Sequence, residues 1–256
     1  MATLSKPEAI ERFHLALLQV MPQHIPPTNY AVKGGANLRL FLGSQRRSED
    51  IDFNFVGRVT WSLQTRMDAV LRAPALKALL AVHGLKIVSI NPSKTTSTTG
   101  RWKFEITGPG VRFNSKVEFS MRREDRPLFR VDAVAASLAA EAGMRRASAN
   151  HYLPTAAIEQ KIAALAYRSA TQARDIFDLD FLLTRYPQES EDAQPSRHEL
   201  DLARRRVFEI TYAEFRELVV AYLDPAFVAM YRGEDEWERM ALDVSGCLDA
   251  MLERAK

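Results

Sequence analysis

The sequence predicts an α+β protein with a mixed-sheet core and an N-terminal helix over residues 1–150, followed by a C-terminal helical domain over residues 151–256. Three observations predict this division. Residues 51–55 and 101–122 alternate apolar and polar side chains, the period of strands with one buried face. From about residue 154 the apolar residues recur at helical spacing instead. The length of 256 residues suits two modest domains.

The first expected element is a helix over residues 5–20, which the prolines of residues 25–28 bring to an end. A glycine pair then predicts a tight turn, and residues 36–42 predict a short helix. A strand is expected over residues 51–55, with Ile51, Phe53 and Phe55 on one face. The polar side chains of Asp50, Asp52 and Asn54 lie on the other face.

The next segment predicts one or two helices over residues 61–80, broken near Pro74, and then a strand over residues 85–90. Beyond a polar run, two alternating stretches flank Gly108-Pro109-Gly110, which is a hairpin signal. On the second strand of this hairpin, Lys116, Glu118 and Ser120 share one face.

The C-terminal part predicts helices throughout, apart from a polar loop over residues 186–199. A helix begins near Pro154, and a second follows over residues 173–185. Further helices are expected over residues 199–207, 211–223 and 234–254.

The bulk composition narrows the class of protein. Cys247 is the only cysteine, so neither an intrachain disulfide nor a zinc site built from cysteines is available. Charged residues interrupt the first twenty positions, which excludes a signal peptide, and no stretch has the length of an apolar membrane span. A cytoplasmic location is therefore expected. The net charge of +3 does not by itself identify a nucleic-acid binder.

The pair Asp50 and Asp52 is the first candidate for chemistry. Carboxylates two residues apart on a strand point to the same side and suit a hard divalent cation such as Mg²⁺. A third carboxylate on a neighbouring strand completes a clamp for in-line phosphoryl transfer, and Glu118 is placed for that. The plainer alternatives are a solvated strand face for the aspartates and a cross-strand salt bridge to Lys116 or Lys103 for Glu118.

Gly43 and Ser44 precede this pair and suit phosphate binding. A glycine lets the backbone approach a triphosphate, and a serine hydroxyl donates to phosphate oxygens. Lys33, Arg46 and Arg47 add charges for the same phosphates. The alternative for Ser44 is that it caps a turn.

Several of these motifs together resemble a known family. The run GGANLRLFLGS followed by RRSEDIDF resembles the first motif of the AbiEii-type toxin nucleotidyltransferases, a branch of the DNA polymerase beta-like superfamily. The resemblance continues through KVEFS, EQKIAALAYR and RDIFDLDFLL, so it spans roughly residues 30 to 183. Asn37 departs from the motif, where a small apolar or hydroxyl residue is expected.

The resemblance implies a nucleotidyltransferase core and an Mg²⁺-dependent toxin that transfers a nucleoside monophosphate from an NTP to an acceptor, with the 3′ end of tRNA as the leading acceptor. Such proteins act in toxin–antitoxin and phage-defence systems, which implies an antitoxin partner. The resemblance also implies that Lys161 contacts the nucleotide phosphates and that Asp175 takes part in catalysis. Arg174 and Asp178, four residues apart on one helix, are expected to pair.

Two other functions remain open at this point: the same transfer onto a protein hydroxyl, and a non-catalytic module that senses nucleotides or binds an antitoxin. For an RNA acceptor, the relevant basic residues are concentrated between the hairpin and the helical part. They are Arg122, Arg123, Arg126, Arg130, Arg145, Arg146, Arg168 and Arg174. The alternative is a surface balanced by nearby acidic residues.

Overall fold

The computed structural model describes residues 4–56, 63–93, 96–122 and 128–255. By its internal contacts the chain divides into two units. The first comprises Met1–Gly43 and Arg47–Tyr152, and the second comprises Ser44–Arg46 and Leu153–Lys256. Three predicted positions lie outside the described residues. They are the helix start at Trp61 and two of the arginines proposed for RNA, Arg123 and Arg126.

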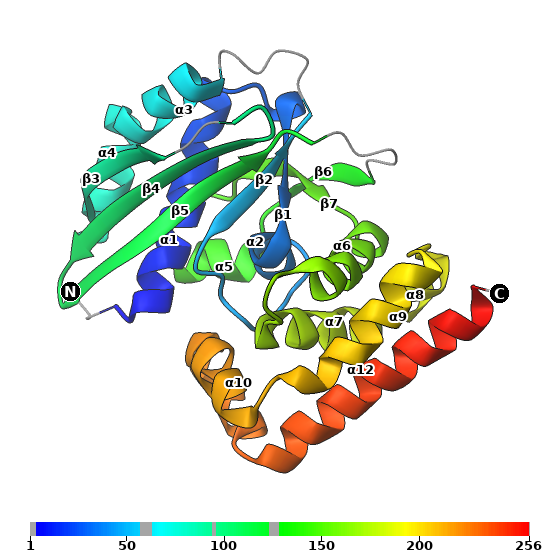
Figure 1. The fold of residues 1–256 in the computed structure, drawn as a ribbon. Coiled ribbons are helices and arrows are strands. Elements are labelled where there is room, and N and C mark those ends of the chain that lie inside the picture. Colours follow the sequence, from blue (N-terminus) through cyan, green and yellow to red (C-terminus); the bar gives the residue numbers. More distant parts are fainter. Residues whose placement is uncertain (1–3, 57–62, 94–95, 123–127, 256) are drawn as a thin grey trace. The chain divides into compact units, whose positions relative to one another are not determined.

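The first unit contains a seven-stranded mixed sheet in the order β3-β4-β5-β2-β1-β7-β6 (Figure 1). Strands β2 and β5 are parallel, as are β1 and β7, whereas the other neighbours are antiparallel. The strands are β1 (Tyr30–Lys33), β2 (Ile51–Phe55), β3 (Lys86–Ser93), β4 (Thr99–Gly108), β5 (Val111–Ser120), β6 (Phe129–Ala133) and β7 (Ser148–Tyr152). The expected hairpin is β4 and β5, joined at Pro109-Gly110, and its Gly110 has a φ of +74°.

Helices α1, α3 and α4 pack beside strands β3 to β5 and cover one face of them (Figure 1). Helix α1 begins with a capping box, in which the Ser5 hydroxyl accepts from the Glu8 amide and the Glu8 carboxylate accepts from the Ser5 amide. The helices of this unit are α1 (Lys6–Val20), α2 (Gly34–Leu40), α3 (Leu63–Arg72), α4 (Pro74–Val82) and α5 (Ala136–Glu141). Helix α2 begins at Gly34, two residues before its predicted start, because the glycine pair forms its first turn instead of a preceding loop.

The hydrophobic core of the first unit lies under the covered face. Strand β4 alternates buried and accessible side chains, so Trp102 and Phe104 point inward. Phe53 on β2 stacks on Phe119 of β5 with ring centroids 4.8 Å apart, and Phe13 of α1 lies 4.6 Å from Phe104. Because these aromatic side chains fill the covered face, the alternate residues of β2, β4 and β5 are left to the opposite, open face.

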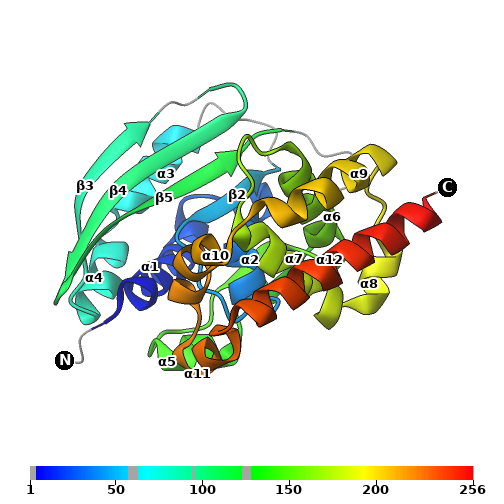
Figure 2. The ribbon, with the colours of Figure 1, turned by 60° about the horizontal axis from the view of Figure 1, so that its bottom comes forward.

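The second unit is helical. Helix α12 packs against α7 and α9, and α6 packs against α7, α8 and α9 (Figure 2). The helices are α6 (Pro154–Tyr167), α7 (Ala173–Arg185), α8 (Pro187–Asp192), α9 (Arg197–Arg206), α10 (Tyr212–Leu218), α11 (Pro225–Val228) and α12 (Glu234–Arg254). The predicted polar loop thus contains α8, whose proline occupies the first helical turn and whose acidic Glu189 favours a helix start. Among the described residues, none of the helices has the length and apolar character needed to cross a bilayer.

Candidate active site

A row of charged side chains crosses the open face of the sheet. Lys33 on β1 is opposite Asp52 on β2, Asp52 is opposite Glu118 on β5, and Glu118 is opposite Arg101 on β4. Residues directly opposite each other on neighbouring strands project from the same face. The register therefore brings Asp52 and Glu118 together, between two cations.

Asp50 lies at the start of β2, beside this row. Its Oδ1 accepts a hydrogen bond from the Lys116 amide at 3.2 Å, and the Lys116 ammonium is 3.4 Å from its Oδ2. Burial raises the pKa of Asp50 above its ordinary value; Lys116 opposes this rise, and the neighbouring charge of Asp52 adds to it. The like charges of Asp50 and Asp52 are thus only partly compensated.

Glu118 is held by two cations. Arg101 Nε donates to Glu118 Oε2 at 2.6 Å, and Lys116 Nζ lies 3.6 Å from the same oxygen. Burial alone raises the pKa of Glu118, but Arg101 and Lys116 outweigh burial and lower the pKa below its ordinary value. Of the two partners considered from the sequence, Lys116 is in contact, whereas the cross-strand partner is Arg101 and not Lys103. The reason is register, which places Lys103 opposite Lys116.

Asp52 approaches a glycine at the start of α2. Gly34 has a φ of +64°, and a Cβ at this position would lie 3.3 Å from Asp52 Oδ2. Asp52 Oδ1 is buried and has no hydrogen-bond partner among the residues that the structure describes. The sequence marked Gly34 only as a turn. Its contact with Asp52 depends on the pairing of β1 with β2, which local sequence does not show.

These residues fit a divalent cation bound through two carboxylates. The buried, unpartnered oxygen of Asp52 and the like charge of Asp50 beside it are the features that a hard cation would satisfy. Over the described residues, no group of three or more His, Cys, Asp or Glu side chains forms a complete cation cage. Mg²⁺ commonly uses one or two carboxylates together with substrate phosphates, so the pair is sufficient.

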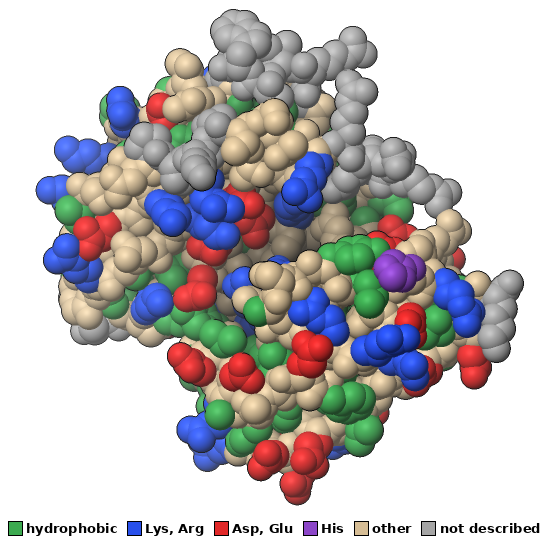
Figure 3. All heavy atoms as spheres, viewed as in Figure 1, with side chains coloured by type: hydrophobic (Ala, Val, Ile, Leu, Met, Phe, Trp, Pro, Cys, Tyr) green, Lys and Arg blue, Asp and Glu red, His purple; other side chains and the backbone are tan. Residues whose placement is uncertain are grey.

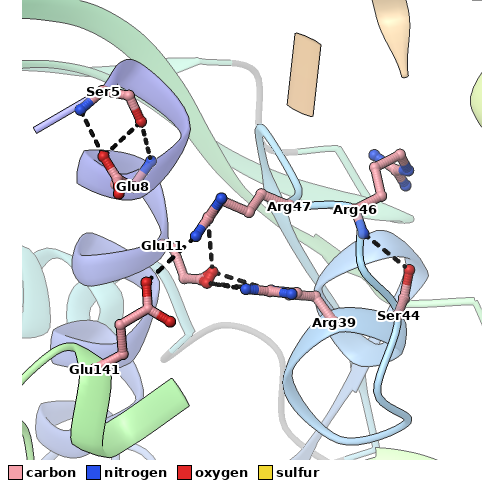
Figure 4. A network of polar contacts seen from close by, with 8 residues as sticks. All are labelled: Ser5, Glu8, Glu11, Arg39, Ser44, Arg46, Arg47 and Glu141. Carbon is pink, nitrogen blue, oxygen red and sulfur yellow. Dashed lines mark hydrogen bonds and ion pairs between the residues drawn. The ribbon is translucent and has the colours of Figure 1, made fainter. Parts of the chain in front are cut away.

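Arg47 belongs to a buried ion-pair network near α1 (Figure 4). Its Nε lies 3.2 Å from Glu11, which also binds Arg39 at 3.0 Å, and its Nη2 lies 3.5 Å from Glu141. Arg47 is only 4% exposed. The structure thus gives Arg47 internal partners, and its predicted contact with phosphate stays a prediction.

Ser44 is buried, and its Oγ accepts a hydrogen bond from the Arg46 amide at 3.3 Å (Figure 4). This is the turn-capping geometry that the sequence left open as an alternative. The adjacent Gly43 has a φ of +86°, and the position that a Cβ would occupy is open. The side chain of Arg46 forms two hydrogen bonds to Asp178, at 3.0 and 2.8 Å. Phosphate binding by Gly43 and Ser44 remains a prediction.

Lys161 is buried in the second unit and is paired with two carboxylates. Its Nζ lies 2.9 Å from Asp175 Oδ1 and 2.6 Å from Asp178 Oδ2. Asp175 is fully buried, and its other oxygen lies 2.8 Å from Arg168. Burial alone raises the pKa of Asp178, but Arg46 and Lys161 lower it to about 2. Lys161 is therefore a buried, paired lysine and not a solvated one.

The expected pairing of Arg174 with Asp178 needs correction. Asp178 binds Arg46 and Lys161 and not Arg174, because α7 turns this carboxylate into the interior, where those cations lie. Several of the arginines proposed for RNA have partners within the chain, as in the alternative of a balanced surface, and their contact with RNA stays a prediction. Arg130 pairs with Asp132, Arg146 donates to the Val134 carbonyl, and Arg168 pairs with Asp175.

Asn37, the departure from the family motif, links α2 to β7. Its Nδ2 donates to the Tyr152 carbonyl at 3.0 Å, and its Oδ1 lies 2.9 Å from His151 Nδ1. Asn37 is 1% exposed. A buried amide with both ends bonded fixes the helix that begins at Gly34. The departure thus has a structural explanation.

Comparison with known proteins gave matches to a family and to solved structures. A family model described as "Nucleotidyl transferase AbiEii toxin, Type IV TA system" matches residues 16–254. Among solved structures, MenT4, a nucleotidyltransferase toxin from Mycobacterium tuberculosis H37Rv, is 16% identical and aligns over 97% of this chain and 94% of that chain with a TM-score of 0.58. JHP933 from Helicobacter pylori is 19% identical and aligns over 98% and 96%, with a TM-score of 0.55. No curated protein matches. At these identities the solved structures show a shared fold.

Proposed function

This chain belongs to the AbiEii nucleotidyl transferase toxin family, and from that premise we propose that it transfers a nucleoside monophosphate from an NTP to an acceptor hydroxyl in RNA, with the 3′ end of tRNA as the leading acceptor. The acceptor hydroxyl loses its proton to solvent and its oxygen bonds to the α-phosphorus, the bond from that phosphorus to the β-phosphate oxygen breaks, and pyrophosphate leaves. The observation that carries this proposal is the row in which Asp52 and Glu118 lie side by side, with Asp50 next to them.

In this proposal Asp50 and Asp52 would hold Mg²⁺. When bound, Mg²⁺ neutralises phosphate charge and lowers the pKa of an attacking hydroxyl. Gly34 keeps the space beside Asp52 open, because any side chain there would crowd the carboxylate. Lys33 adds a positive charge on the same face, directly opposite Asp52.

Glu118 has a different part in the proposal. Its pKa lies below the ordinary value, so it stays ionised but is a weak proton acceptor near neutral pH. We therefore propose that Glu118 orients the acceptor hydroxyl by accepting a hydrogen bond from it. Binding of the metal by Glu118 as a third carboxylate remains the alternative within the proposal. Lys161 would bind nucleotide phosphates, as in the family motif, and Asp175 would position Lys161, which it contacts.

The test of the proposal is transfer of label. Purified protein is incubated with each α-³²P-labelled NTP, total RNA and lysate protein, and the labelled fraction is identified. Labelled RNA is the expected result. Labelled protein would establish the alternative acceptor, and no label in either fraction would favour a nucleotide-sensing or antitoxin-binding module.

The double variant Asp50→Asn, Asp52→Asn should abolish transfer, because carboxamides retain the shape but lose the charge that binds Mg²⁺. A milder Asp52→Glu variant keeps the charge and moves the oxygens, so Mn²⁺ or a higher Mg²⁺ concentration should partly restore it. Circular dichroism checks folding in each case. Wild-type transfer by the double variant would overturn the metal assignment.

A further inference from the structure

A groove of about 510 Å³ adjoins the candidate site on the open face of the sheet. Its lining includes Asn91 on β3, Lys103 on β4, and Asn114 and Lys116 on β5. Asp50 also lines it, so the groove reaches one of the two carboxylates proposed to hold the metal. Figure 3 shows Lys and Arg side chains beside Asp and Glu side chains over this part of the first unit.

Two lysines lie side by side in this groove. Lys103 and Lys116 are directly opposite in the antiparallel register of β4 and β5. Like charges in this position destabilise a strand pair. The charge of Lys116 is compensated by Asp50 and Glu118. Lys103 is exposed and, within the described ranges, forms no ion pair or hydrogen bond through its side chain. The structure thus holds one uncompensated cation in the groove.

The remaining lining has the chemistry of a nucleic-acid contact. The Asn91 and Asn114 carboxamides each offer a donor and an acceptor, which is what base edges and ribose hydroxyls pair with. The groove has two acidic lining residues, and both are already paired: Glu105 with Arg112, and Asp50 with Lys116. The groove therefore combines an available positive charge with polar groups that can bind nucleotides.

We propose that this groove binds the acceptor strand as single-stranded RNA, with Lys103 contacting a backbone phosphate and the two asparagines contacting bases or ribose. This inference rests on the proposed function, because it assigns a strand whose 3′ hydroxyl is presented to the carboxylates at the Asp50 end. The phosphate that Lys103 contacts belongs to the acceptor and not to the NTP, and these two sources are separable by experiment.

The first test measures RNA binding without chemistry. A fluorescein-labelled single-stranded oligoribonucleotide is titrated with protein in EDTA and without NTP, at several salt concentrations. Lys103→Ala should weaken binding roughly three- to tenfold and reduce the slope of log K against log salt by about 0.7, the value for one single-strand phosphate contact. Lys103→Arg should retain binding.

Lys77→Ala is the matched control, because Lys77 is an exposed lysine on helix α4 and its loss changes the net charge equally. It should leave both affinity and salt slope unchanged. Equal affinities of Lys103→Ala and wild-type protein would overturn the groove assignment, as would equal weakening by both alanine variants.

The second test shows whether Lys103 contacts a phosphate of the RNA or of the NTP. It also distinguishes failure of the proposed transfer from failure of the groove assignment. In the labelling assay, Lys103→Ala should raise KM for RNA and leave KM for NTP unchanged; the reverse pattern would assign Lys103 to the nucleotide and overturn the inference. Wild-type protein that labels nothing would refute the proposed transfer. Wild-type labelling together with unchanged RNA binding and KM in Lys103→Ala would refute the groove alone.

Discussion

At the scale of single residues, the candidate site depends on charges that partly cancel. Glu118 is held by Arg101 and Lys116, whereas Asp52 keeps a buried oxygen without a partner among the described residues. Isolated buried charge is costly, so a cation bound by Asp50 and Asp52 would relieve both the desolvation and the repulsion between them. Because Gly34 lies directly beside Asp52, adding one methyl group at Gly34 should disturb this carboxylate.

Gly34→Ala should lower the transfer rate by roughly tenfold or more, because the new Cβ crowds Asp52 Oδ2 and displaces a carboxylate that positions the substrate. The positive φ should also cost about 1–2 kcal/mol of unfolding free energy. Labelling kinetics and urea denaturation measure the two effects.

Gly143→Ala is the matched control, since Gly143 has a φ of +61° and open space around it. It should show the same stability loss with unchanged transfer. If both variants lost transfer equally, Gly34 would act through stability alone and its contact with Asp52 would be irrelevant to catalysis.

At the scale of elements, buried ion pairs connect α6, α7 and the segment Ser44–Arg46 of the second unit. Lys161 on α6 binds both Asp175 and Asp178 on α7, and Arg46 binds Asp178 from the segment. Removing one member of a buried set leaves an uncompensated charge, which is more harmful than loss of a surface pair. Variants of this cluster therefore affect folding as well as any contact with nucleotide.

Lys161→Ala should lower the free energy of unfolding by about 3–5 kcal/mol, because it leaves two buried carboxylates short of a cation. Urea denaturation followed by circular dichroism measures this. Lys77→Ala, which removes an exposed lysine, should change stability by less than about 0.5 kcal/mol. Similar midpoints for the two variants would contradict the buried cluster.

If Lys161 also contacts phosphate, the fraction of Lys161→Ala protein that folds should still transfer poorly from NTP. Extra Mg²⁺ should not restore the transfer rate. Rates are therefore compared per folded molecule. A wild-type rate over the whole NTP range would limit Lys161 to a structural role.

Asp180 on α7 predicts a pH-dependent contribution to stability. Burial, and then the charge of Asp243 on α12, raise its pKa to about 6, against the opposing Arg239. The folded state then binds the proton more tightly than the unfolded state, so stability falls as pH rises from about 4 to about 6. Asp180→Asn removes this loss.

At pH 7 Asp180→Asn should be more stable than wild-type protein by about 1–3 kcal/mol, and near pH 4 the difference should vanish. Denaturation at the two pH values measures this. Asp192→Asn, on the exposed surface of α8, should change neither value. An Asp180→Asn variant as stable as wild-type protein at pH 7 would show that Asp180 is solvated.

At the scale of the whole molecule, the proposed function requires the folded protein to bind NTP together with a metal ion. A ligand that binds only the folded state stabilises it by mass action, by about 2.7 kcal/mol at one hundred times Kd. Stability therefore reports nucleotide binding independently of transfer.

A non-hydrolysable NTP analogue with Mg²⁺ should raise the thermal unfolding midpoint, and EDTA should abolish the rise because the carboxylates then repel the triphosphate. Differential scanning fluorimetry measures both midpoints. The double variant Asp50→Asn, Asp52→Asn should show no metal-dependent rise. An equal rise with and without EDTA would mean that nucleotide binds without the metal.

The sequence by itself determined the features that depend on local patterns. Strand β2, the hairpin of β4 and β5, and helix α12 follow from alternation, turn residues and helical periodicity over a few neighbouring positions. The order of the motifs also identified the family, which the family model confirms. Strand β1 escaped prediction because three of its four residues are buried in succession, so it shows no alternation. Strand β6 also escaped prediction, although it is as long as β2.

Only the tertiary structure decided which partner each charged side chain has. Arg46 and Asp178 are 132 positions apart, and Arg39 and Glu11 are 28 apart, so no local pattern links them. Register selected Arg101 for Glu118, and burial turned Asp178 away from Arg174. Ion pairs depend on which surfaces the hydrophobic core brings together, and that is a property of the packed chain and not of any segment within it.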